Sequence, residues 1–333
     1  MSAPSRVLVA GAGSAGRRHL RNLRALLPSA HLACWRMAGT ASDPELDGLA
    51  DSVVFDERAA HALAPDAVVV AGPAPSHVPV ALPFVARRVP VLIEKPLCHR
   101  LSDADALITA AERAGGVALV GYMLRFHPLL LALRAQLAAG AVGPVMTVDA
   151  EVGQSLTEWR PSKPYTETVS ARKALGGGAL LELSHEFDYL SWLLGPVERV
   201  GAFTATLSGL KLDVEDCAAL AVRFASGALG TVSMDLVRRP MRRGCRIHGR
   251  EGTLELDLVG QRLRIGRADS AWEVLDERPG FDRNDLFLGE LRHFLACVSG
   301  DAEPAVTLRE GRHALAMALA AAQSASEGRM IDV

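Results

Sequence analysis

The first 120 residues alternate short apolar runs with segments of helical periodicity. The runs lie at 7–10, 32–35, 53–55, 67–71, 89–93 and 117–120. Between the first two runs, leucines recur at helical spacing within 17–27, and a second helix is expected at 103–114 with Ser102 as its N-cap. Strands that alternate with helices predict a parallel sheet covered on both faces. We therefore expect a Rossmann-type, doubly wound α/β domain over residues 1–122.

The pattern changes after residue 126. A helix with leucines along one face precedes longer strands, which are expected at 145–151, 197–207, 217–224, 229–236, 245–248, 253–258 and 262–265. Tight turns at 225–227 and 250–252 separate neighbouring strands, so the second sheet is expected to be large, open and mostly antiparallel. Helices are expected at 177–194, 284–298 and 308–325. We assign 123–333 to a second α/β domain, whose last helix is expected to pack on either domain.

Composition narrows the function classes. A chain of 333 residues favours two domains, and 49% hydrophobic with 22% charged residues is typical of a globular protein. The net charge of −2 does not favour nucleic acid, and no apolar run has the length of a membrane span. The N-terminal stretch leads into a glycine turn and reads as a strand rather than a signal peptide. Five scattered cysteines without a C-x-x-C pair argue against a metal site and favour a reduced, cytoplasmic protein.

A glycine-rich turn follows the first expected strand. Gly11, Gly13 and Gly16 form a G-x-G-x-x-G pattern between a strand and a helix, and Ser14 and Ala15 open that helix. Such glycines allow a tight turn, close approach of the backbone to a pyrophosphate, and close helix–strand packing. The helix N-terminus offers N–H groups to the phosphates. This context predicts a dinucleotide site formed by these five residues.

The end of the second expected strand bears on the choice of cofactor. An NAD site usually has an acidic residue there, whereas this chain has Arg36 within Cys34-Trp35-Arg36-Met37. An arginine suits the 2′-phosphate of NADP, with help from Arg17 or Arg18. NADP is therefore favoured over NAD, the alternative being that Arg36 is merely solvated.

Two constellations carry candidate chemistry. Lys95 lies in Glu94-Lys95-Pro96 at the end of the fifth expected strand, the edge where ligands bind in open α/β sheets. A lysine there can hydrogen-bond a reacting oxygen, and Pro96 restricts its backbone and permits a cis bond. The second is 176–195, where a glycine run opens an expected helix. Spacing of three places Glu182, His185 and Asp188 on neighbouring parts of one face, as suits a general base.

Together these motifs resemble the Gfo/Idh/MocA family of oxidoreductases. The resemblance runs through GAGSAGRRHLRNL at 11–23, DAVVVAGPAPSH at 66–77, EKP at 94–96, VGYMLRFHP at 120–128, GGGALLELSHEFDYLSWLLG at 176–195 and the closing helix. It implies hydride transfer between a nicotinamide and a hydroxyl or keto carbon, usually of a sugar, cyclitol or related polyol. It further implies a homodimer or homotetramer built on the open sheet.

The resemblance also implies site residues. Lys95 matches the catalytic lysine, His185 matches the catalytic histidine, and Asp188 matches the acid three residues later. Cofactor contacts are expected from the glycine turn and Arg36, and from Gly72, Pro73, His77, Glu94 and Lys95. Family members carry an aspartate four residues before the histidine, whereas this chain has Glu182 three before it. We assign the carboxylate role to Glu182, with Glu186 as the alternative.

Substrate contacts are expected from Arg125, His127, Trp159, Arg160, Lys163 and Asp188. Because 159–173 is basic, an acidic, phosphorylated or nucleotide-linked sugar is one hypothesis, and a solvated loop is the other. A second basic stretch, 238–246, is expected at a sheet edge or a subunit interface. Two rival functions remain: a non-redox enzyme that uses NAD transiently, and a regulatory protein that binds NAD(P) without chemistry.

Overall fold

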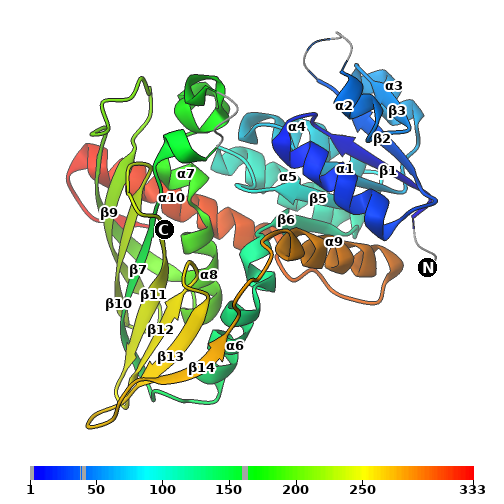
Figure 1. The fold of residues 1–333 in the computed structure, drawn as a ribbon. Helices are drawn as coiled ribbons and strands as arrows, with labels where there is room; N and C mark the ends of the chain where they lie inside the picture. The colour runs from blue at the N-terminus through cyan, green and yellow to red at the C-terminus, as the bar shows by residue number, and fades with distance from the viewer. Residues whose placement is uncertain (1–3, 38, 40–42, 160–163) are drawn as a thin grey trace. The chain divides into compact units, whose positions relative to one another are not determined.

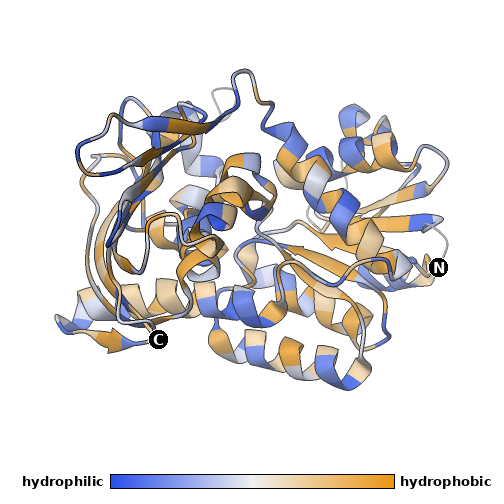
Figure 2. Cartoon of the chain, turned by 90° about the horizontal axis from the view of Figure 1, so that it is seen from below, coloured by the Kyte–Doolittle hydropathy of each residue, from blue (hydrophilic) through white to orange (hydrophobic). Residues whose placement is uncertain are grey.

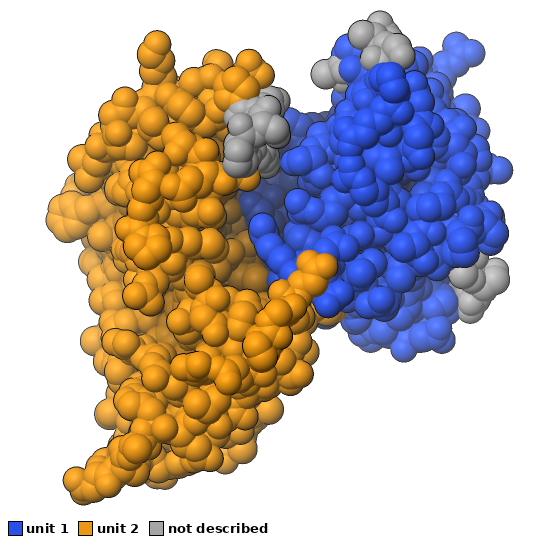
Figure 3. Space-filling view, in the orientation of Figure 1, with its two compact units in different colours: residues 1–123, 283–312 blue, residues 124–282, 313–333 orange. Residues whose placement is uncertain are grey.

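The computed structural model describes residues 4–37, 39, 43–159 and 164–333. The chain divides into two compact units, coloured separately in Figure 3: unit 1 comprises 1–123 and 283–312, and unit 2 comprises 124–282 and 313–333. The sequence pattern had assigned every residue after 122 to the second domain. The structure differs in that the segment 283–312 belongs with the first unit.

Unit 1 is built on a six-stranded sheet in the order β3-β2-β1-β4-β5-β6. Every pairing within it is parallel, as predicted for a doubly wound domain. The strands are mostly buried and hydrophobic (Figure 2) because helices cover both faces. Their bounds are β1 Arg6–Ala10, β2 His31–Trp35, β3 Ser52–Val54, β4 Ala67–Val70, β5 Val91–Glu94 and β6 Ala118–Gly121.

The helices of unit 1 are α1 Ser14–Leu26, α2 Pro44–Asp47, α3 Glu57–Ala62, α4 Ala74–Val85, α5 Leu101–Ala114 and α9 Asn284–Ser299 (Figure 1). Helix α5 begins before the expected cap, so its N-cap is Arg100 rather than Ser102. Helix α4 contains Pro79 and Pro83, which disfavour a helix interior, and it was not among the expected helices.

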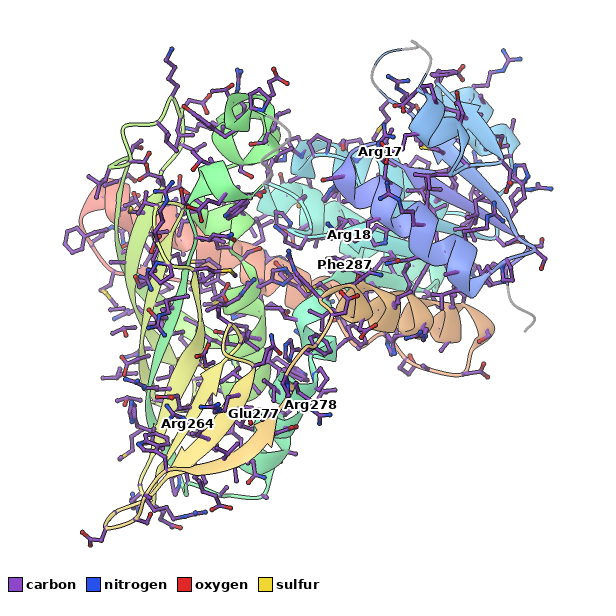
Figure 4. The ribbon with its side chains drawn as sticks, viewed as in Figure 1. Arg17, Arg18, Arg264, Glu277, Arg278 and Phe287 are labelled. Atoms are coloured by element: carbon purple, nitrogen blue, oxygen red, sulfur yellow. The ribbon has the colours of Figure 1, made fainter. Side chains whose placement is uncertain are left out.

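Helix α9 packs against α1 although more than 250 residues separate them in sequence. Asn22 and Asn284 exchange side-chain hydrogen bonds of 3.1 and 3.0 Å. The Arg18 guanidinium lies 4.1 Å from the ring centroid of Phe287, and both residues are labelled in Figure 4. The apolar residues of α9 complete the core of unit 1; they are Leu291, Phe294, Cys297 and Val298.

Unit 2 is built on a nine-stranded sheet in the order β14-β13-β12-β11-β7-β10-β9-β8-β15. Strands β7 and β10 pair in parallel and the remaining pairs are antiparallel, so the sheet is mixed and mostly antiparallel, as predicted. The bounds are β7 Val145–Gly153, β8 Val197–Ala205, β9 Cys217–Phe224, β10 Leu229–Asp235, β11 Arg242–Gly249, β12 Thr253–Asp257, β13 Arg262–Gly266, β14 Glu273–Glu277 and β15 Ile331–Asp332.

The helices of unit 2 are α6 Pro128–Ala138, α7 Ala179–Glu182, α8 His185–Leu194 and α10 Leu308–Glu327, of which α10 begins in unit 1. Short 3-10 helices lie at Met123–Phe126, Leu156–Glu158, Tyr165–Glu167, Val169–Ala171 and Lys173–Leu175. The single helix expected at 177–194 is wrong: the chain forms α7 and α8, interrupted at Leu183 and Ser184. Across the described residues, none of the helices combines the length and the hydropathy of a membrane span.

Candidate functional site

The glycine turn after β1 is shaped by two close backbone approaches. Gly11 has φ of +130°, and a Cβ there would lie 2.5 Å from the Ala71 carbonyl oxygen. A Cβ on Gly16 would lie 1.8 Å from the Gly11 carbonyl oxygen. A Cβ on Gly13, in contrast, would meet no described atom within 4 Å. Two glycines are therefore required by packing, and Gly13 leaves open space beside the turn.

This turn fits a dinucleotide. Gly13 is the N-cap of α1 and places no side chain on the first N–H groups, which belong to Ser14 and Ala15. The helix N-terminus carries a partial positive charge, and the space beside Gly13 allows a phosphate to approach the backbone. When bound here, NAD(P) supplies the carbon that accepts or donates a hydride.

Charged side chains gather at the end of β2. Arg17 donates through Nε to the Ala12 carbonyl at 3.1 Å and through Nη1 to Asp43 Oδ1 at 3.1 Å. Arg36 Nη1 lies 3.9 Å from Asp43 Oδ2. The hydrogen bond from Arg17 lowers the pKa of Asp43. Arg36 was predicted from the sequence and Asp43 was not, although the pair Asp43-Pro44 is typical of the cap and first residue of a helix.

The turns after β4 and β5 lie beside the glycine turn. Strands β1, β4 and β5 are consecutive neighbours, so their carboxyl ends share one edge of the sheet. His77 joins the two later turns: its Nδ1 lies 2.9 Å from the Pro96 carbonyl oxygen and its Nε2 lies 2.9 Å from the Gly72 carbonyl oxygen. The peptide bond between Lys95 and Pro96 is cis. Gly72, Pro73, Glu94 and Lys95 are thus brought to the edge that carries the glycine turn.

The carboxylate of Glu94 contacts a buried histidine, His19. His19 Nε2 lies 2.8 Å from Glu94 Oε1, and the Lys95 N–H donates to Glu94 Oε2 at 3.2 Å. Burial opposes ionisation of Glu94, but the hydrogen bond and charge of His19 and the charge of Lys95 lower its pKa overall. Glu290 of α9 has the opposite behaviour: burial and the charge of Glu94 raise its pKa well above the usual range. Cationic neighbours therefore favour the ionised form of Glu94, whereas burial and the charge of Glu94 disfavour the ionised form of Glu290.

In unit 2, the break between α7 and α8 changes the expected arrangement around His185. Glu182 ends α7 and accepts a 2.8 Å hydrogen bond from Ser170 Oγ, whereas His185 begins α8 and is 5% exposed. The assumption that both residues lie along one continuous helix face is therefore wrong. The first N–H groups of α7, those of Ala179 and Leu180, donate to Glu215.

The other two carboxylates of this segment pair with arginines inside unit 2. Glu186 is fully buried and accepts from Arg243 at 2.8 and 2.9 Å. Asp188 accepts from Arg125, and their side chains are 1% and 3% exposed. Both acids predicted for the carboxylate role thus have partners in unit 2, Arg243 for Glu186 and Ser170 for Glu182.

Of the remaining predicted substrate residues, His127 and Trp159 are described by the structure and lie on different elements of unit 2. His127 is the N-cap of α6; it accepts from the Leu129 N–H at 3.2 Å, and its ring centroid lies 4.9 Å from that of Phe281. Trp159 Nε1 donates to the Gln154 carbonyl at 3.2 Å. Arg160 and Lys163 lie outside the described residues.

The second basic stretch does not lie at a sheet edge, contrary to one expectation. Strand β11 is flanked by β7 and β12, and two of its arginines, Arg243 and Arg246, pair within the unit. Arg243 contacts Glu186 and Arg246 contacts Glu255, while Arg239 of the preceding turn contacts Glu158. These three arginines therefore form ion pairs with acidic residues on other elements of the same unit.

The fold and the turn geometry define a two-unit protein that binds a dinucleotide. In the described part of the chain, His, Cys, Asp and Glu side chains form no group of three or more suited to a metal ion. The family model for the NAD-binding Rossmann fold of the oxidoreductase family matches residues 5–122, and the GFO/IDH/MocA C-terminal domain model matches 130–255.

Curated relatives agree. A myo-inositol dehydrogenase of Streptomyces leeuwenhoekii is 30% identical over 97% of this chain and 98% of its own. The rhizopine catabolism protein MocA of Rhizobium meliloti is 32% identical over 51% of each chain, and a 1,5-anhydro-D-fructose reductase of Ensifer adhaerens is 28% identical over 73% and 72%. The chain belongs to the Gfo/Idh/MocA family of oxidoreductases.

Solved structures share the fold of the whole chain. A levoglucosan dehydrogenase in complex with NADH and levoglucosan superposes with a TM-score of 0.86 at 19% identity, covering 98% of this chain and 99% of that one. The WlbA dehydrogenase of Bordetella pertussis, in complex with NADH and UDP-GlcNAcA, gives 0.82 at 23% identity, covering 100% and 99%.

Proposed function

We propose that this protein is an NAD(P)-dependent dehydrogenase or reductase that acts on a hydroxyl or keto carbon of a sugar, cyclitol or related polyol. The names of its relatives support this substrate class, since they include inositol dehydrogenases and a keto-sugar reductase. The family model supports the nicotinamide cofactor.

One observation in unit 1 carries the proposal. Lys95 follows β5 directly and lies at the same sheet edge as the glycine turn after β1, with β4 between them. Two strand spacings amount to roughly 10 Å, a distance that a dinucleotide bound at the turn spans easily. Glu94, which contacts His19, accepts a hydrogen bond from the backbone N–H of Lys95.

Each residue then has a distinct proposed role. In the oxidative direction, His185 takes the hydroxyl proton and Lys95 stabilises the developing alkoxide by donating a hydrogen bond. Glu182 orients His185, and Ser170 holds Glu182 in turn. Arg125, His127, Trp159, Arg160, Lys163 and Asp188 are proposed to form or support the substrate site. A nucleotide-linked acidic sugar stays a candidate, since one solved neighbour contains UDP-GlcNAcA.

The experiment is a Lys95→Met variant assayed against a panel of inositols, sugars and keto-sugars. Turnover should fall by roughly 10²–10⁴-fold, the usual scale for a general acid–base group, while the dissociation constant of the reduced cofactor changes little. A Lys211→Met variant, which removes an exposed lysine of unit 2 outside the basic stretch 159–173, is the matched control. Unchanged turnover in Lys95→Met would contradict the assignment. Cofactor binding without turnover of any panel member would favour a regulatory protein.

We further propose a cytoplasmic homodimer or homotetramer. All five cysteines are unpaired, as suits a reducing compartment. Large apolar side chains are exposed on several strands of the nine-stranded sheet, among them Met146 on β7, Phe203 on β8 and Leu229 on β10. Light scattering of the purified protein tests the assembly, and a monomer at micromolar concentration would contradict it.

A further inference from the structure

Four charged side chains form a cluster beside the glycine turn, which we call the β2-end cluster: Arg17, Arg36, Asp43 and Glu45. Arg17 contacts both acids, since its Nη1 donates to Asp43 Oδ1 at 3.1 Å and to Glu45 Oε2 at 3.0 Å. Its Nη2 donates to the second oxygen of Asp43, which makes the pair bidentate. Arg36 approaches the same Asp43 oxygen at 3.9 Å.

The cluster is attached to the cofactor turn. Arg17 Nε donates to the carbonyl of Ala12, the residue between the first two glycines of the turn. The side chains of Arg17, Arg36 and Asp43 are 18%, 19% and 20% exposed, so they are partly withdrawn from water while remaining accessible. Glu45 is 57% exposed and also contacts Arg21 on its outer side. Asp43 is thus the inner acid and Glu45 the outer one.

We infer that Asp43 is a specificity-determining residue that occupies the cationic site where a 2′-phosphate would bind, and so makes the protein prefer NAD(H) to NADP(H). This inference rests on the proposed function, because it concerns the adenosine end of the same cofactor. It reverses the preference for NADP that Arg36 alone indicated.

Charge balance gives the physical reason. A phosphate monoester carries nearly two negative charges, and bidentate pairing to arginine is its preferred mode of recognition. In this chain the bidentate face of Arg17 is already paired with a carboxylate. NADP must therefore displace Asp43 or bind next to its charge, whereas a ribose hydroxyl brings no charge and leaves the pair in place.

The test is an Asp43→Asn variant, with binding of NADH and NADPH measured separately by the change in nicotinamide fluorescence. Asparagine keeps the cap of α2, which Asp43 forms by accepting from the Leu46 N–H, so the fold should be retained. Asp47→Asn is the matched control, because it removes one exposed acid from the same short helix. Arg17→Gln in the Asp43→Asn background tests whether Arg17 is the residue that binds the 2′-phosphate once the charge of Asp43 is removed.

We expect wild type and Asp47→Asn to bind NADH more tightly than NADPH. In Asp43→Asn, the affinity for NADPH should rise about tenfold, the effect of removing one charge about 6 Å from a dianion in a water-like dielectric. NADH affinity should change less than about threefold, and the added Arg17→Gln change should abolish the gain.

Three outcomes would overturn the inference alone: a wild type that prefers NADPH, an Asp43→Asn variant with an unchanged ratio, or one that only loses NADH. The last outcome would make Asp43 a ribose-binding acid. If the wild type binds neither nucleotide, the proposed function fails and the inference fails with it.

Discussion

Arg125 and Asp188 form a bidentate ion pair inside unit 2, although 63 residues separate them in sequence. Nε donates to Oδ2 at 3.0 Å and Nη2 donates to Oδ1 at 2.7 Å. The Trp192 ring centroid lies 5.5 Å from the Arg125 guanidinium carbon. The pair joins the segment before α6 to the middle of α8, so it fixes the helix that carries His185.

Breaking this pair should destabilise the protein strongly. Asp188→Ala leaves a guanidinium buried without its carboxylate, and a cost of about 3–5 kcal/mol in the free energy of unfolding is expected. Urea denaturation measures it. The double variant Arg125→Met with Asp188→Leu should recover most of the loss, because both charges are then removed. A cost below about 1 kcal/mol for Asp188→Ala would show that water reaches the arginine.

Two substitutions in the glycine turn should affect cofactor binding and stability separately. Gly13→Ala places a methyl in open space, so the melting temperature should be retained while cofactor affinity falls at least about tenfold, because the methyl occupies the phosphate approach. Gly16→Ala places its methyl against the Gly11 carbonyl and should cost about 2 kcal/mol or more of stability. Thermal unfolding and cofactor fluorescence distinguish the two variants. A Gly13→Ala variant that loses stability, or a Gly16→Ala variant that keeps it, would contradict the turn geometry.

His127 should make the protein sensitive to acid. Burial, and then the charges of Arg243 and Arg278, lower the pKa of His127 to about 4. The unfolded chain, with a pKa near 6.5, binds this proton first as pH falls, so stability is full above pH 6.5 and is lost progressively between 6.5 and 4. The loss should approach about 3 kcal/mol.

The corresponding variant is His127→Asn, which keeps an acceptor at the N-cap of α6. Its free energy of unfolding should depend less on pH between 6.5 and 4 than that of the wild type. Denaturation series at several pH values measure the difference. Identical slopes for the two proteins would show that His127 is not buried as a neutral group.

Glu290 should lower the stability of the protein as pH rises, whereas His127 lowers it as pH falls. Burial and the charge of Glu94 raise its pKa well above the unfolded value of 4.5, so its contribution to stability is full below pH 4.5 and is lost as pH rises through the folded pKa. Glu290→Gln keeps a neutral side chain of similar shape. The variant should gain stability over wild type as pH rises from 5 to 9, whereas Asp285→Asn, on the exposed side of α9, should show no such gain. A variant less stable than wild type at pH 9 would contradict a protonated Glu290.

The fold was largely predictable because strand patterns are strong. Strand β9 alternates buried and exposed residues along its whole length, and it was predicted at its observed bounds. Strand β14, with sequence EVLDE, was missed because few of its residues are apolar and its side chains are not fully buried. The two-residue β15 is too short to form a pattern and is held by pairing with β8.

The candidate site was predictable only in part. The glycine turn between a strand and a helix, and Lys95 directly after a strand, were predicted and are observed. The start of a helix at His185 was not predicted. The bidentate pair of Arg17 and Asp43 joins residues 26 positions apart in sequence, and no local periodicity predicts such a contact. The start of α7 contacts Glu215, which is 35 positions away in sequence, and a local pattern does not predict such a contact.

Because α9 completes the core of unit 1, this unit cannot finish folding during translation until residues near 300 have left the ribosome. A nascent chain of 123 residues would present the α1 face around Leu20 and Leu23 without its covering helix. The segment 124–282 of unit 2 lies in the sequence between the two segments of unit 1, so it is synthesised before the nucleotide-binding unit can complete its core. An expressed fragment that ends at residue 123 is therefore a poor mimic of that unit, and a circular permutant joining 283–312 directly to 1–123 would be a better one.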